Sequence, residues 1–211
     1  MCLYTSGTNQ VKVGDIFTSD KKYISPDKLT SDIKPIGVVS FIHKEDGKPN
    51  IIGLHQNEKR WCNRKPNVLF YGRKVPINVT NYADAFIDFN GRDYTDALKN
   101  NFGEEINEFP SLKYCLDYNT EGTNKGDWFF MSSGEVLQTI RNVLVINDTI
   151  QRINDVSGKE TAEPIAYHEW YCSIAVCDYS SIWICYSGNV SLDLWHYYDK
   201  RRFTYVRPAL R

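Results

Sequence analysis

The stretch EWYCSIAVCDYSSIWICYSGNVSLDLWHYYDKRRFTYVRPALR, residues 169–211, decides the fold of this chain. Aromatic and β-branched residues are dense in it, which favours β-strands over helix. Turn-forming residues interrupt it at Ser187-Gly188-Asn189 and again around Asp199-Lys200. The stretch therefore predicts at least three short strands.

The strand expected at residues 190–197 has two different faces, because successive side chains of a strand point to opposite sides. The apolar face suits a core and carries Val190, Leu192, Leu194 and His196. The other face combines a hydroxyl, a carboxylate and two large rings, from Ser191, Asp193, Trp195 and Tyr197. Tryptophan and tyrosine provide contact area at low entropic cost, so this face predicts a ligand-binding surface. The alternative is a solvent face whose rings pack on a loop.

The composition argues against several classes of function. The chain has 211 residues, enough to bury a core, and 25 basic and 26 acidic residues give it a formal net charge of −1. This balance lacks the positive surface typical of proteins that bind nucleic acids or anionic membranes, so neither is an expected partner. No window approaches the roughly 18 apolar residues of a membrane-spanning helix, so membrane insertion is not expected.

The N-terminal residues MCLYTSGTNQ show neither the charged nor the apolar region of a signal peptide. We therefore expect either a protein made without export or one whose leader has been removed. In the second case, Cys2 would occupy the position of an acylated lipoprotein cysteine.

The cysteines are even in number but scattered, and none forms a C-x-x-C pair. A chain of this length does not need disulfide bonds to fold, so we expect free, buried thiols in a reducing compartment. The six positions are Cys2, Cys62, Cys115, Cys172, Cys177 and Cys185.

The chain divides into an N-terminal arm, residues 1–10, and a single domain, residues 11–211. The arm is small and polar, so we expect a partner to order it. Within the domain we expect β elements at 11–72, helices at 82–154 and the aromatic terminal sheet at 165–211.

Local patterns place the elements within these parts. Apolar runs predict strands at 11–18, 34–43 and 50–55, the last two joined as a hairpin. Short helices are expected at 94–101, 110–118 and 147–153. Ser132 followed by Glu135 is a capping box, which opens a further helix whose inward side chains are Val136, Leu137, Ile140, Val143 and Leu144.

Several segments together resemble a known family. They are GDWFFMSSGEV (126–136), a tryptophan-led stretch from Trp170, SSIWICYSGNVS (180–191) and YVRPAL (205–210), preceded by KVGDIFTSD and KPIGVVSFIH. This series resembles the C-terminal domain family first named from a Legionella collagen-like protein. The family is common in gut Bacteroidetes and their phages, where some members are variable proteins of diversity-generating retroelements. The chain departs from the family at FMS (130–132), where Leu-Pro-Ser is usual, and at YCSI (171–174), where a Ser/Thr-rich segment is usual.

The resemblance implies an α+β, C-type-lectin-like fold with short helices on one side of a twisted antiparallel sheet. It also implies that exposed positions of the terminal sheet contact the ligand. Besides the face that carries Ser191, Asp193, Trp195 and Tyr197, these positions are Tyr171, Ser173, Tyr179, Ile184 and Tyr186. Trp183 and Cys185 are expected to point inward.

Calcium-dependent sugar binding and catalysis are both weakly supported. The calcium-binding tripeptides of sugar-binding C-type lectins are absent, and Glu163-Pro164-Ile165 lacks the third ligand. The same fold hosts formylglycine-generating oxidases, for which Cys172 and Cys177, with His168 nearby, are the candidate residues. The familiar nucleophile, phosphate-binding and zinc motifs are missing, so no cofactor or metal is expected.

Arg207 is expected to be an internal partner of a carboxylate.

These patterns predict a non-enzymatic recognition module on a bacteriophage virion, such as a head fibre, decoration protein or tail component. Its expected ligand is a host-surface protein or glycan. We also expect the protein to form a homo-oligomer and to contact other virion subunits. The alternatives are a secreted or lipid-anchored Bacteroidetes adhesin at the bacterial cell surface and a purely structural virion subunit. The oxidase is a further alternative.

Overall fold

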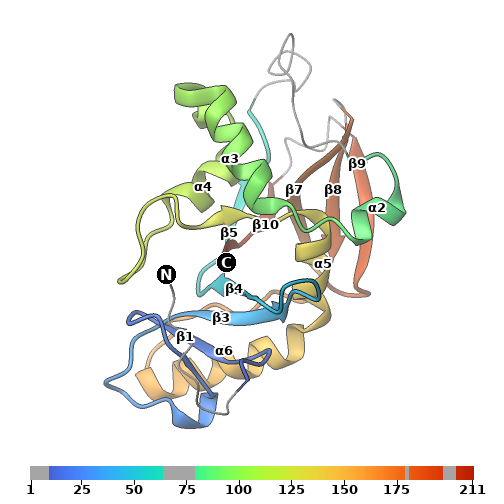
Figure 1. The fold of residues 1–211 in the computed structure, drawn as a ribbon. Helices are drawn as coiled ribbons and strands as arrows, with labels where there is room; N and C mark the ends of the chain where they lie inside the picture. The colour runs from blue at the N-terminus through green and yellow to red at the C-terminus, as the bar shows by residue number, and fades with distance from the viewer. Residues whose placement is uncertain (1–9, 64–78, 179–180, 197–202) are drawn as a thin grey trace.

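The described residues form two β-sheets (Figure 1), and buried side chains from both sheets belong to one hydrophobic cluster. The computed structural model describes residues 10–63, 79–178, 181–196 and 203–211. The largest cluster of buried side chains includes Ile52 and Ala209 from one sheet and Trp183 and Leu192 from the other. Most of the predicted N-terminal arm lies outside the described residues.

In the described part of the chain, the first sheet has six strands in the order β2-β1-β3-β4-β11-β6, and its strand pairs are antiparallel. The predicted hairpin is confirmed, because Val38 of β3 pairs with Ile52 of β4. The first strand is shorter than the predicted 11–18. The bounds are β1 (Ile16–Thr18), β2 (Tyr23–Ile24), β3 (Pro35–Ile42), β4 (Pro49–Gly53), β6 (Phe129–Phe130) and β11 (Pro208–Leu210).

The second sheet has five strands among the described residues, in the order β5-β10-β7-β8-β9. Strand β10 runs parallel to β7 where Tyr205 pairs with Tyr171, and the other pairs are antiparallel. The strands predicted in the aromatic stretch are therefore confirmed. Their bounds are β5 (Asn57–Arg60), β7 (Trp170–Asp178), β8 (Ser181–Tyr186), β9 (Ser191–His196) and β10 (Phe203–Val206).

The helices are short, and with the antiparallel sheets they confirm the α+β class. The described elements are η1 (Pro26–Lys28), α2 (Tyr82–Phe86), α3 (Gly91–Phe102), η2 (Gly103–Glu108), α4 (Pro110–Asp117), α5 (Ser133–Arg141) and α6 (Val143–Ser157). Among these described helices, none is long and apolar enough to cross a membrane.

The break between α5 and α6 corrects one sequence prediction. Leu144 was expected to point inward but is 75% exposed. The backbone leaves the helical conformation at Asn142, whose φ and ψ are −101° and 15°, and α6 then starts in a new direction. The Asn142 amide donates hydrogen bonds to the carbonyl oxygens of Ser40 at 2.8 Å and Gln138 at 3.1 Å. These contacts hold the break against β3, so the helical spacing does not continue through it.

Helices cover both faces of the second sheet, whereas the sequence predicted helices on one side only. On one face, Trp183 and Cys185 of β8 belong to the same buried cluster as Ile140 of α5 and Ile150 of α6. On the other face, the sheet packs against α3 and α4. In Figure 1, α6 runs beside β3, far from α3 and α4.

The capping box at the start of α5 is formed, and it is completely buried. One carboxylate oxygen of Glu135, Oε2, accepts the backbone N–H of Ser132 at 2.7 Å and its hydroxyl at 3.0 Å. The other oxygen, Oε1, has no hydrogen-bond partner among the described residues. Burial raises the pKa of Glu135 from 4.5 to about 7, against the lowering effect of the Ser132 hydrogen bonds.

We predict that Glu135→Gln removes a loss of stability that the wild type undergoes as the pH rises from 5 to 8. The folded protein binds the Glu135 proton up to about pH 7, but the unfolded chain releases it near pH 4.5. The contribution of this group to the free energy of unfolding is therefore largest below pH 4.5 and falls by about 3 kcal/mol as the pH rises to 7. His43, whose pKa burial lowers to about 4, makes both proteins more stable over the same pH range, so its effect cancels in the comparison. The measurement is the change in the free energy of unfolding, from urea denaturation, between pH 5 and pH 8, which should be about 2–3 kcal/mol less favourable in the wild type than in the variant. An equal change in both proteins would refute the assignment.

Arg207 lies where the chain passes from β10 of one sheet to β11 of the other, and its side chain is buried. Its guanidinium donates hydrogen bonds to the backbone carbonyls of Gly53, Glu163 and Pro164 and to the side-chain oxygen of Gln56. The internal position predicted for Arg207 is confirmed. Its hydrogen bonds to described residues, however, go to carbonyl oxygens rather than to a carboxylate.

We predict that Arg207→Lys lowers the free energy of unfolding by about 3 kcal/mol. An ammonium group cannot reproduce the planar set of donors, so several buried carbonyl groups lose their partners. The urea midpoint is the measurement. The control is Arg152→Lys, because Arg152 is exposed, and this variant should stay within about 0.5 kcal/mol of the wild type.

Candidate binding surface

Three of the predicted contact residues belong to the core. Tyr171 is 3% exposed and Ser173 is 1% exposed, so their expected surface position is wrong. The Tyr171 hydroxyl donates to the Gln56 side chain at 2.8 Å, and the Ser173 hydroxyl donates to the Trp183 carbonyl at 2.9 Å. Ile184 is buried as well. The physical reason is that helices cover both faces of the sheet, so alternation does not select a solvent face at β7 and β8.

Other predicted residues do reach the surface at the edge of the sheet. Asp193 of β9 is exposed, and Ser191 and Tyr186 are half-buried. Ser191 pairs directly with Tyr186 across β8 and β9, so the two side chains share a face. Trp183 and Cys185 point inward as predicted. The predicted positions Tyr179, Tyr197 and the side chain of Trp195 lie outside the described part of the chain.

Four rings gather at the start of β7 and the end of β8, and we call Tyr167, His168, Trp170 and Tyr186 the aromatic corner. The centroids of Tyr167 and His168 are 4.4 Å apart, and those of Trp170 and Tyr186 are 4.7 Å apart. His168 Nδ1 lies 3.2 Å from the Tyr186 hydroxyl. Tyr167 is 56% exposed. The corner therefore presents ring surface together with hydroxyl and imidazole groups.

Two backbone features hold the rings in place. His168 and Val190 have φ values of 63° and 56°, a left-handed conformation that side-chain-bearing residues rarely adopt. A Cβ on Gly188 would lie 2.4 Å from His168 Nδ1 and 2.6 Å from a Tyr186 ring carbon. Only glycine allows the turn to approach the rings so closely. Local strain of this kind persists where the surrounding structure fixes it, and it is frequent at binding sites.

A buried serine joins the two turns that carry the corner. The Ser187 hydroxyl donates to the Ala166 carbonyl at 2.9 Å and accepts the Glu169 N–H at 3.0 Å. The corner is therefore fixed before any ligand arrives, which reduces the entropic cost of binding.

The sequence indicated Tyr186 as a contact residue but not Tyr167 or Trp170, and it pointed to His168 only for the oxidase alternative. Tyr167 and His168 precede the strand, so strand alternation does not apply to them. The turn signal at residues 187–189 indicated a turn, but strand alternation does not show which residues lie beside it. The pairing of Trp170 with Tyr186 and the hydrogen bonds of Ser187 bring residues 167–168 next to that turn.

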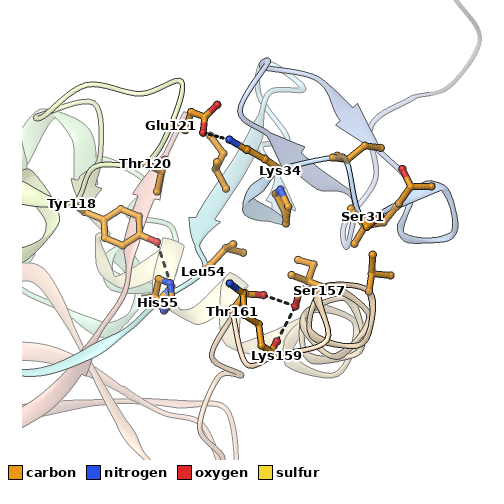
Figure 2. Close-up of a pocket in the computed structure, with 17 residues that line it drawn as sticks. Ser31, Lys34, Leu54, His55, Tyr118, Thr120, Glu121, Ser157, Lys159 and Thr161 are labelled. Carbon is orange, nitrogen blue, oxygen red and sulfur yellow. Dashed lines mark hydrogen bonds and ion pairs between the residues drawn. The ribbon is translucent and has the colours of Figure 1, made fainter.

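A pocket of about 560 Å³ lies elsewhere, between the loop after η1, the end of β4, the loop after α4 and the C-terminal end of α6 (Figure 2). Leu54 and Ile153 contribute apolar surface, and Lys34 and Glu121 form a 2.6 Å ion pair at its mouth. Tyr118 is directed toward His55, whose backbone N–H donates to the tyrosine hydroxyl at 3.3 Å. The volume suits a small ligand, and no sequence motif indicated this pocket.

The thiols and the acidic residues bear on the catalytic alternative. Cys115, Cys172 and Cys185 are free thiols, and these three and Cys62 are buried. Burial raises the pKa of Cys172 to about 11, which disfavours the thiolate that a reactive cysteine needs. The side chain of Cys177 is outside the described part. Within the described residues, no group of three or more His, Cys, Asp or Glu side chains is arranged to hold a metal ion.

A solved structure with a similar fold is that of a fimbrial protein from Bacteroides ovatus ATCC 8483. The two structures superpose with a TM-score of 0.69 over 94% of this chain, at 13% sequence identity. The match covers 48% of the fimbrial protein, so this chain spans about half its length. At such low identity the likeness shows a common fold, and it does not identify that fold as C-type-lectin-like. No protein-family model and no curated protein matches the chain.

We predict that Gly188→Ala separates the His168 and Tyr186 rings. The added methyl group overlaps both rings, so one of them must move, at a cost of about 1–3 kcal/mol in the free energy of unfolding. Urea denaturation measures the cost, and NMR contacts between the two rings report the separation. Asn189→Ala leaves the space beside His168 open and serves as the control. Retention of both the ring contacts and the stability in the Gly188 variant would contradict the steric argument.

Proposed function

We propose that this chain is a non-enzymatic recognition module displayed on the surface of a Bacteroidetes cell, as part of a fimbria or another adhesin. The observation that carries the proposal is its fold similarity, over 94% of its length, to a fimbrial protein of a Bacteroides species. This location was the alternative among the sequence-based predictions. The comparisons give no support to a virion, which was the main prediction.

The aromatic corner is the proposed contact surface. Exposed tyrosine rings offer flat apolar area for a sugar face or a protein side chain, while hydroxyl and imidazole groups donate and accept hydrogen bonds. Asp193 and Ser191 extend this surface along β9, at the edge of the sheet. The ligand class is a glycan or protein on another cell's surface. Ligand contact by Trp195 and Tyr197 remains a prediction, and so does the formation of a homo-oligomer.

The non-enzymatic part of the proposal is supported by the state of the described thiols. The oxidase alternative requires an accessible thiolate, but Cys172 is buried and its pKa is raised to about 11. Catalysis is therefore not part of the proposal.

Tyr167→Ala tests the contact surface. The change removes an exposed ring, so we expect at least a tenfold loss of affinity on an array of immobilised glycans and host-surface proteins, with the melting temperature changed by less than about 3 °C. The matched control is Phe203→Ala, because Phe203 is 57% exposed on β10, outside the aromatic corner. The control should bind like the wild type.

Two results would count against the proposal. Equal losses in the two variants would mean that the aromatic corner is not the specific contact. Protease treatment of intact cells should also degrade the protein at the surface, and complete protection in intact but not lysed cells would refute surface display.

A further inference from the structure

A second cavity, of about 680 Å³, lies between the end of the β3–β4 hairpin, the segment after α2 and the exposed side of α5. None of the sequence-predicted contact residues lines it, and neither does the aromatic corner. Four segments that are far apart in the sequence meet here, at residues 41–45, 86–90, 138–141 and 211. We call it the phenylalanine pocket because Phe41, Phe86 and Phe89 line it.

Three rings of the pocket lining pack against one another. The Phe41 centroid lies 4.8 Å from that of His43 and 5.8 Å from that of Phe89, and His43 and Phe89 are 5.6 Å apart. At the mouth, Phe86 and Ile87 are exposed. Exposed apolar side chains beside a cavity are typical of a binding site, because a ligand that covers them removes apolar area from water.

The charges of the pocket favour an anion. Lys44, Arg141 and Arg211 line it, with Glu45 as the acidic residue among the lining side chains. Arg211 is already paired with Asp46 at 2.7 Å. The Arg141 guanidinium lies 6.0 Å from the centre of the Phe86 ring and has no carboxylate within 4.0 Å in the described part of the chain. Arg141 is therefore available to bind a planar carboxylate through two hydrogen bonds.

His43 adds an unpaired polar group to the pocket lining. The residue is buried, and its Nε2 has no hydrogen-bond partner among the described residues. Burial, followed by the charge of Arg211, lowers the pKa of His43 to about 4, while the charge of Asp46 acts in the opposite direction. The imidazole is thus neutral near pH 7. Buried polar atoms in native proteins normally have a partner, so an unpaired one points to a missing ligand or water.

We propose that the phenylalanine pocket binds a small carboxylic acid with a flat, apolar ring. The ring lies against Phe41 and Phe89, and the carboxylate pairs with Arg141. The cavity volume suits a molecule of one or two rings. A sugar acid fits less well, because its hydroxyl groups would lose water beside three phenylalanines and two isoleucines without gaining enough partners. This site is independent of the proposed surface recognition.

Isothermal titration calorimetry with indole-3-acetate tests the proposal on the wild-type protein. Indole-3-ethanol has the same ring without the charge, and galacturonate has the charge without the flat ring. We expect indole-3-acetate to bind at least ten times more tightly than either, a difference of about 1.4 kcal/mol. Arg141→Gln should remove this preference over indole-3-ethanol. Arg141→Lys, which keeps the charge but not the planar donors, should bind with intermediate affinity.

The control variant is Arg152→Gln, because Arg152 is exposed on α6 and does not line the pocket. It should bind indole-3-acetate like the wild type, and all variants should keep the wild-type melting temperature. Tighter binding of galacturonate would overturn the proposed ligand class. Absence of heat at 1 mM for all three probes, or unchanged binding by Arg141→Gln, would overturn the site.

Discussion

The hydrogen bonds of one buried guanidinium connect the two halves of this structure. Arg207 separates β10 from β11, so the last strands of the two sheets are adjacent in sequence and meet at this residue. Its donors satisfy carbonyl oxygens from the end of β4 and from the loop after α6. Without these donors, the carbonyl oxygens would be buried without hydrogen-bond partners, which would lower the free energy of unfolding. The crossing between the sheets depends on this network.

The shared interior determines where function can lie. Because helices cover both faces of the second sheet, large parts of β7 and β8 are buried and unavailable to a ligand. Polar and aromatic groups reach solvent at the ends of these strands and along β9, and cavities form where loops and helix ends meet. The fold therefore provides several small surfaces at its rim rather than one broad face. A rigid corner such as the one around Gly188 suits recognition because little order is lost when a ligand binds.

The candidate site could be predicted from sequence only in part. Strand alternation placed Asp193 correctly on the exposed side. The family resemblance placed Trp183 correctly on the inner side but misplaced Tyr171 and Ser173, because helices cover both faces of this sheet and leave these positions buried. Tyr167 and His168 carry no periodic signal at all. Their neighbours come from long-range pairing, which a single sequence does not reveal.

Local sequence patterns determined individual structural elements, whereas tertiary packing determined how these elements are arranged. The sequence by itself determined the α+β class, the β3–β4 hairpin, the aromatic strands and the capping box that opens α5, because each depends on residues close together in the chain. The tertiary structure decided the division into two sheets, the break at Asn142, the burial of Tyr171 and the assembly of the aromatic corner. These depend on contacts between residues far apart in sequence, whose energies no local pattern encodes.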